Sequence, residues 1–222
     1  MKSIVVLTGA GVSQESGIPT FRDSNGLWEG HRVEDVASPE GFERDPALVH
    51  QFYNLRRARL PEVSPNPAHH ALVRLEKEWK GNFLLVTQNV DDLHFRAGSR
   101  KLVPMHGELA KARCQGCGHT AVWPGELGVD SSCPGCGRSG VLRPHIVWFH
   151  EVPFFLEEIF AALESCDIFL SVGTSGNVYP AAGFVAHTRP GSRRIEVNLG
   201  GTQISRAFQE HGVGKAVEEL LR

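Results

Sequence analysis

Four cysteines in two Cys-x-x-Cys pairs constrain the fold of this chain more than any other feature. The pairs are Cys114/Cys117 and Cys133/Cys136, with fifteen residues between them. Four thiolates at this spacing close a tetrahedral zinc site with no open position, so we predict one structural Zn²⁺ per chain. Because a closed site offers substrate no place on the metal, any chemistry must lie elsewhere in the chain.

Apolar runs alternate with helical patterns on both sides of the cysteine module. Strands are expected at 4–7, 83–86, 167–172 and 194–198, and helices at 45–60, 67–79, 154–165, 179–188, 204–209 and 215–221. Strands that alternate with helices predict an α/β fold with a doubly wound, mostly parallel sheet, into which the smaller zinc-ribbon module is inserted.

The composition limits the classes of partner. Lys+Arg (23) and Asp+Glu (25) nearly cancel, so the net charge of -2 provides no basic field for nucleic acid. The first ten residues lack the pattern of a signal peptide, and no apolar run reaches the roughly 18 residues of a membrane span. Cysteines in paired metal spacing suit a reducing compartment. We therefore expect a cytoplasmic protein with neither a membrane nor a nucleic-acid partner.

Polar loops follow the carboxyl ends of the predicted strands, where open α/β sheets bind ligands. Gly9 and Gly11 allow close backbone approach, and their N–H groups can cradle a phosphate. A tight turn without a ligand is the alternative, because Gln14 stands where the dinucleotide fingerprint has its third glycine. The strand-end residues Thr174, Ser175 and Asn198 leave the same choice open, since each can bind a ribose or cap a helix.

His106 is the best candidate for a general base. It lies in a polar run just before the cysteine module, although a lone histidine is more often structural than catalytic. Gln88, Asn89 and Asp91 place two amides and a carboxylate at one strand end, which suits the binding of a carboxamide. This set strengthens the interpretation of His106 as catalytic.

Several of these motifs occur together, in this order, in one known family. The segments are 9–13, 15–22, 87–91, 106–107, the cysteine quartet, 173–175 and Asn198. Over essentially its whole length the chain resembles the sirtuins, NAD-dependent protein-lysine deacylases. The resemblance implies that NAD lies between a large Rossmann-like domain and a small zinc-bearing one, with the acyl-lysine entering the same cleft. The acyl oxygen attacks C1′ of the nicotinamide ribose, nicotinamide leaves, and a histidine activates the ribose hydroxyl. The products are free lysine, nicotinamide and O-acyl-ADP-ribose.

The resemblance also assigns roles to individual residues. It makes His106 the general base, Asn89 its catalytic companion, and Val147 part of the segment that binds the substrate backbone as an added strand. The implied partner is an acylated lysine in a protein or peptide, and the oligomeric state is left open, a monomer included. The residues implied in NAD binding are Gly9, Ala10, Gly11, Phe21, Arg22, Gln88, Asn89, Val90, Asp91, Gly173, Thr174, Ser175, Asn198, Leu199, Gly200 and Ala216.

Tyr53 and Arg56 carry a signal about the acyl group. They stand three residues apart in the predicted 45–60 helix and share a face. A phenol beside a guanidinium binds a carboxylate through charge-assisted hydrogen bonds. Without the family context, the alternative interpretation is that Tyr53 belongs to the hydrophobic core and Arg56 is a solvated surface charge. With it, the pair resembles that of class III sirtuins, which remove succinyl, malonyl or glutaryl groups as well as acetyl.

The resemblance implies that the chain is divided into two parts. The large part covers approximately 1–28, 66–110 and 145–222, and the small domain covers approximately 29–65, a helical insertion, and 111–144, the zinc module. Because the chain carries no long extension, we expect a minimal core of bacterial or archaeal type.

His150 stands where the family usually has glycine, so its side chain is expected to crowd the peptide groove.

Two other functions remain as alternatives. One is mono-ADP-ribosyl transfer from the same NAD site, and the other is a zinc-ribbon module that binds nucleic acid or protein. The second leaves the polar residues at 88–91 and 106 without a role. An NAD-linked dehydrogenase is disfavoured further, since hydride transfer needs no pocket that cleaves nicotinamide.

Overall fold

A six-stranded parallel sheet forms the larger part of the computed structural model, which describes residues 2–19, 27–28 and 30–221. Its strand order is β11-β10-β9-β1-β4-β5. Winding proceeds outward from β1 in both directions, as in a doubly wound nucleotide-binding sheet, so the predicted fold class is confirmed. The strands are β1 (Ile4–Thr8), β4 (Phe83–Thr87), β5 (Leu102–Pro104), β9 (Ile168–Val172), β10 (Arg193–Asn198) and β11 (Glu210–Val213).

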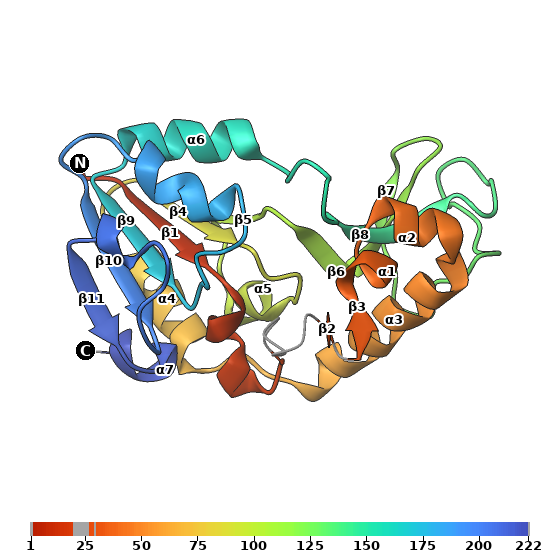
Figure 1. Cartoon of the computed structure of the whole chain (residues 1–222), viewed down its shortest axis with the longest axis horizontal. Helices are drawn as coiled ribbons and strands as arrows, with labels where there is room; N and C mark the ends of the chain where they lie inside the picture. Colours follow the sequence, from red (N-terminus) through yellow and green to blue (C-terminus); the bar gives the residue numbers. More distant parts are fainter. Residues whose placement is uncertain (1, 20–26, 29, 222) are drawn as a thin grey trace.

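Helices bury both faces of this sheet. In the central strand β1, Val5 and Leu7 point into one core cluster, while Ile4 and Val6 point into the other. Helix α6 (Leu156–Ser165) and the 3₁₀ helix η4 (Ala181–His187) cover the first face, and α4 (Pro67–Glu78) and α7 (Ala216–Glu219) cover the second. Figure 1 shows α6 and α4 on opposite sides of the strands. Burial on both faces explains why the central strands are continuous apolar runs.

The second part of the molecule lies at the opposite end from β11 in Figure 1. Helix α3 begins after Asp45, whose carboxylate accepts a hydrogen bond from the Leu48 N–H at 2.9 Å, with Pro46 at the first helical position. Its buried face packs on an antiparallel sheet in which β6 lies between β7 and β8. The elements are β2 (Leu27–Trp28), β3 (His31–Arg32), α1 (Val33–Val36), α2 (Pro39–Arg44), α3 (Pro46–Arg59), β6 (Gly107–Cys114), β7 (Thr120–Val122) and β8 (Leu142–Ile146).

The carboxyl-terminal region differs from the sequence expectation. The segments predicted as helices at 179–188 and 204–209 are 3₁₀ helices, and β11 was not predicted. This strand pairs with β10 at the edge of the sheet, and its sequence is Glu-His-Gly-Val, so it has no apolar run to reveal it. The remaining short elements are η1 (Ala10–Val12), η2 (Gln14–Ser16), η3 (Leu60–Glu62), α5 (Leu93–Ala97) and η5 (Ser205–Ala207).

Two expectations concern the chain as a whole. The division into large and small domains at the boundaries given above stays a prediction. Of the helices formed by residues 2–19, 27–28 and 30–221, none has both the length and the apolar character needed to cross a membrane.

Candidate active site

A cavity of about 1340 Å³ lies at the carboxyl ends of β1, β4 and β9, between the parallel sheet and the second part of the molecule. Most of the predicted site residues line it, whereas Gly200 does not, and Phe21 and Arg22 lie outside the described residues. The predicted residues on its wall are Gly9, Ala10, Gly11, Tyr53, Arg56, Gln88, Asn89, Val90, Asp91, His106, Val147, Gly173, Thr174, Ser175, Asn198, Leu199 and Ala216.

The turns after β1 and β9 pack directly against each other. The Gly9 N–H donates to Val172 O at 3.0 Å and the Gly11 N–H donates to Gly173 O at 2.9 Å. A Cβ on Gly11 would lie 2.8 Å from the Gly173 Cα, and Gly173 itself has φ +63°. These glycines therefore serve a close backbone approach. In this structure both N–H groups donate within the protein, and the prediction that Gly9 and Gly11 bind the phosphates of the cofactor stays a prediction.

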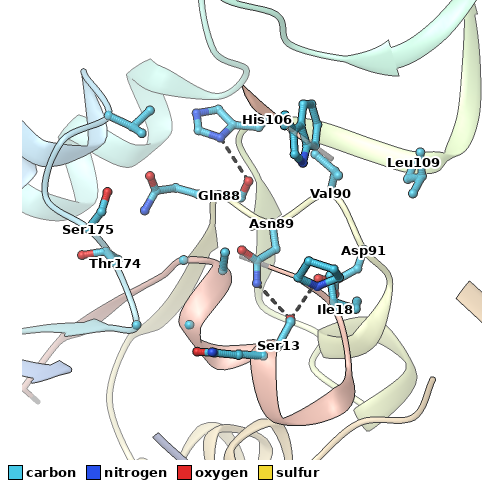
Figure 2. Close-up of a pocket in the computed structure, with 18 of the residues that line it drawn as sticks. Ser13, Ile18, Gln88, Asn89, Val90, Asp91, His106, Leu109, Thr174 and Ser175 are labelled. Carbon is cyan, nitrogen blue, oxygen red and sulfur yellow. Dashed lines mark hydrogen bonds between the residues drawn. The ribbon is translucent and has the colours of Figure 1, made fainter. Parts of the chain in front are cut away.

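Ser13 joins the two polar strand ends beneath the cavity. Its hydroxyl donates to Asp91 Oδ2 at 2.9 Å and accepts from Asn89 Nδ2 at 3.1 Å, as Figure 2 shows. Asp91 Oδ1 also accepts the Leu93 N–H at 3.0 Å. Burial raises the pKa of the Asp91 carboxyl. Ser13 was not among the residues predicted for the site, although its place in the turn after β1 could have suggested it.

The hydrogen bond of His106 fixes which ring nitrogen is basic. Its Nδ1 lies 3.1 Å from the Gln88 carbonyl oxygen (Figure 2), which can only accept, so Nδ1 carries the proton. The other nitrogen, Nε2, is left with its lone pair. Burial lowers the pKa of His106, and the bond to Gln88 opposes that effect. The ring is therefore a neutral imidazole with one defined basic atom in the cavity wall.

Residues from β9, β10 and α7 meet at another part of the cavity. The Asn198 side-chain amide donates to the Thr174 carbonyl, and the Thr174 hydroxyl lies 3.1 Å from that of Ser171. Lys215, which precedes α7, forms an ion pair with Glu15 at 3.1 Å across 200 residues of sequence. These contacts connect the turn after β1 to the end of the chain, around the region predicted to receive adenosine.

Tyr53 and Arg56 come together as expected from the 45–60 helix. The Tyr53 ring has no exposed surface, and its hydroxyl accepts a hydrogen bond from Trp148 Nε1 at 3.0 Å. Burial raises the pKa of this phenol. The Arg56 guanidinium carbon lies 3.2 Å from the Phe52 ring centroid and 4.8 Å from that of Trp28. The guanidinium therefore lies against both rings, a contact that arginine often makes with aromatic side chains.

The segment predicted to bind substrate backbone forms one edge of the cavity. Its Val147 N–H donates to the His106 carbonyl at 2.9 Å, so the segment is tied to the base. His150 has φ +71° and is exposed. This left-handed conformation suits glycine and strains other residues, so the backbone at this position fits the glycine that the family resemblance led us to expect.

The four cysteines lie apart from the cavity and close to one another. Their sulfur atoms all lie within 4.8 Å, with Cys114 to Cys136 at 3.8 Å and Cys117 to Cys133 at 3.7 Å. A tetrahedral ion with bonds of about 2.3 Å holds its sulfurs about 3.8 Å apart. The backbone N–H and guanidinium of Arg138 lower the pKa of Cys136 to about 6, which favours the thiolate. The predicted structural zinc site is confirmed.

Buried side chains at the carboxyl ends of β1 and β4 form hydrogen bonds with one another and with a histidine of α5. The Thr8 hydroxyl donates to Thr87 Oγ1 at 2.9 Å and lies 3.0 Å from His94 Nε2. The Asn89 N–H also donates to Thr87 Oγ1, so this group reaches the cavity wall. The ring centroids of His94 and His69 are 4.7 Å apart. Burial keeps these rings neutral, because a charged imidazole is costly there.

The buried histidines should make stability depend on pH. Burial lowers the pKa of His50 and His69 to about 4 and that of His94 to about 3. The unfolded chain then binds more protons below pH 6.5, so stability falls as pH drops from 6.5 toward 4. We expect about 1–2 kcal/mol less unfolding free energy per histidine at pH 5 than at pH 7.5, measured by urea denaturation. His69→Gln should flatten this dependence and His70→Gln, on the exposed side of α4, should not. Equal slopes in both variants would contradict the assignment.

The sheet, the cavity and the four-cysteine site define a nucleotide-binding α/β protein with an inserted zinc ribbon. The Sir2 family model matches residues 9–180. The chain belongs to the Sir2 family, which confirms the family resemblance seen in the sequence.

Curated relatives and solved structures agree with this assignment. The chain is 60% identical to an NAD-dependent protein deacylase of Bdellovibrio bacteriovorus, over 100% of this chain and 94% of the relative. It is 54% identical to one of Pasteurella multocida, over 97% and 93%. A Sir2 homologue bound to ADP-ribose superimposes with a TM-score of 0.91 at 38% identity, covering 99% of this chain and 89% of that one. A Sir2 homologue in complex with NAD gives 0.90 at 38%, over 99% and 86%.

Proposed function

We propose that this chain is an NAD-dependent deacylase of protein lysine that yields nicotinamide and O-acyl-ADP-ribose. The observation that carries the proposal is the neutral His106, whose Nδ1–H donates to the Gln88 carbonyl while its Nε2 has no protein partner among residues 2–19, 27–28 and 30–221. The relatives' names and the ligands of the solved homologues support the choice of reaction and of NAD as co-substrate. The cysteine usage favours a cytoplasmic location, which we retain as part of the proposal.

Each polar residue of the cavity has its own role in the proposed reaction. His106 Nε2 removes a proton from a ribose hydroxyl, as a general base with a pKa below its ordinary value can do near neutral pH. Asn89 and Asp91, both anchored by Ser13, hold the carboxamide of nicotinamide. Bound NAD supplies the activated C1′ carbon and the nicotinamide leaving group. The zinc site holds the β6–β8 module in place and takes no part in the chemistry.

Each of the other residues predicted to bind NAD is assigned to one part of the cofactor. Gln88 and Val90 face the ribose and nicotinamide, and Phe21 and Arg22 are proposed for the diphosphate and nicotinamide region on sequence alone. The adenosine end is assigned to a set of residues around β9, β10 and α7: Gly173, Thr174, Ser175, Asn198, Leu199, Gly200 and Ala216. Of these, Gly200 is the one outside the cavity wall among the described residues.

We assign the acyl end of the cavity to groups that bear a carboxylate, such as succinyl and malonyl, in addition to acetyl. Tyr53 and Arg56 both line the cavity, and the charge of Arg56 acts on the Tyr53 phenol. Because Arg56 packs against the rings of Phe52 and Trp28, an acyl carboxylate must compete with these contacts for the guanidinium. A charged hydrogen-bonded pair in a partly dry pocket is strong enough to do so.

Arg56→Met should separate the two activities. Methionine keeps the length and apolar stem of arginine but removes the charge, so kcat/KM for a succinyl-lysine peptide should fall about ten- to a hundredfold. The same peptide with acetyl-lysine should lose far less. Initial rates with NAD on the two peptides measure the difference. Arg44→Met, an exposed arginine on α2, is the matched control. Equal losses on both peptides would reject the pocket assignment.

A further inference from the structure

The hydroxyl of Tyr53 has one hydrogen-bond partner among the described residues, and that partner determines its direction. Trp148 Nε1 lies 3.0 Å from Tyr53 Oη, and both side chains are buried. An indole N–H can donate and cannot accept. The Tyr53 oxygen is therefore the acceptor in this bond, and its own proton is left for another acceptor.

No acceptor for that proton is present in the protein as far as residues 2–19, 27–28 and 30–221 show. Burial raises the pKa of Tyr53, so the phenol keeps its proton. A buried donor without an acceptor destabilises a protein unless a ligand completes the hydrogen bond. A carboxylate is the strongest acceptor available to an O–H group, and the neighbouring Arg56 supplies the matching charge.

Trp148 is held so that its N–H cannot turn away. The Arg143 guanidinium carbon lies 3.2 Å from the Trp148 ring centroid. Arg143 also donates two hydrogen bonds to Glu151, at 2.7 and 2.9 Å, and Glu151 accepts the Trp148 backbone N–H at 2.8 Å. The indole is 3% exposed. This arrangement fixes both the ring and the backbone of Trp148.

We propose that Trp148 is a positioning residue for acyl selection: its indole N–H occupies the acceptor side of the Tyr53 hydroxyl and directs the phenolic proton toward the carboxylate of an acyl-lysine. This inference rests on the proposed acyl pocket and adds a residue that acts through Tyr53. The reaction at the base His106 does not involve it.

Trp148→Phe removes the N–H and keeps an aromatic ring over Arg143. The ratio of kcat/KM for succinyl-lysine to that for acetyl-lysine should fall about three- to tenfold, mainly through the KM for the succinyl peptide. In a Tyr53→Phe background the same substitution should leave the ratio unchanged, because no hydroxyl remains to be oriented. Replacing Trp148 with benzothienylalanine, which exchanges only the N–H for sulfur, gives the same test without a change in ring size.

Trp79→Phe is the matched control. Its indole N–H donates to the Lys2 carbonyl at 3.0 Å, far from the cavity, and the ratio should not change. An unchanged ratio in both Trp148 variants, or an equal fall in the Tyr53→Phe background, would overturn the inference. If the wild-type protein removes no succinyl group, the acyl pocket fails and this inference with it. If the wild type removes succinyl and Arg56→Met does not, an unchanged ratio overturns only the role of Trp148.

Discussion

His106→Ala should reduce kcat for deacylation about 10²- to 10⁴-fold, the range expected when a general base is removed. The physical reason is the tautomer of the ring. Because the Nδ1–H donates to the Gln88 carbonyl, Nε2 is the proton acceptor, and alanine has no atom to replace it. Single-turnover rates on an acetyl-lysine peptide with saturating NAD measure the loss. Binding of NAD, followed by calorimetry, should weaken far less than the rate.

The control for this experiment is His70→Ala, an exposed histidine on α4, which should retain the wild-type rate. The pH profile provides a second readout. The base must be neutral, and burial lowers the pKa of His106, so the rate plateau should extend below pH 6.5 before activity declines. A His106→Ala enzyme with near-normal kcat would show that the base lies elsewhere.

Loss of zinc should have the second largest effect. Cys136→Ser removes one of the four sulfur atoms that meet within 4.8 Å, and a three-ligand remnant binds zinc much more weakly. We expect the bound zinc to fall from about one ion per chain to a small fraction of that, with activity reduced at least about tenfold as the β6–β8 module loosens. Metal analysis and circular dichroism follow the two changes.

Cys166→Ser is the matched control for the zinc experiment. Cys166 is buried in the core of the parallel sheet, outside the cysteine cluster, so this variant should keep its zinc. A Cys136→Ser protein with full zinc content and full activity would contradict the assignment of the four cysteines as one structural site.

The central strands could be predicted because their burial dictates their composition. The run at 4–7 is apolar throughout, since both faces of β1 are covered by helices. The edge strand β11 was missed for the opposite reason: half of its residues face solvent, and its pairing with β10 depends on the tertiary fold. Local sequence identifies buried elements better than edges.

The candidate site was predictable in its residue types but not in its hydrogen bonds. Spacing alone sufficed to indicate a metal site at the cysteine quartet, whereas His106 was indicated by the polar residues at 88–91 and by the family resemblance together. The sequence could not show that Gln88 fixes the histidine tautomer, that Ser13 links Asn89 to Asp91, or that the glycine amides donate across to the turn after β9. Each of these contacts joins segments far apart in the chain, so only the folded arrangement reveals them.

The most direct test of the proposed function is the stoichiometry of one reaction. The purified protein is incubated with an acetyl-lysine peptide and NAD, and the products are separated and weighed by mass spectrometry. The proposal predicts equal amounts of free lysine peptide, nicotinamide and O-acetyl-ADP-ribose, and no product when NAD is omitted. Free acetate without NAD consumption, or ADP-ribose attached to protein in place of the small acyl product, would contradict it.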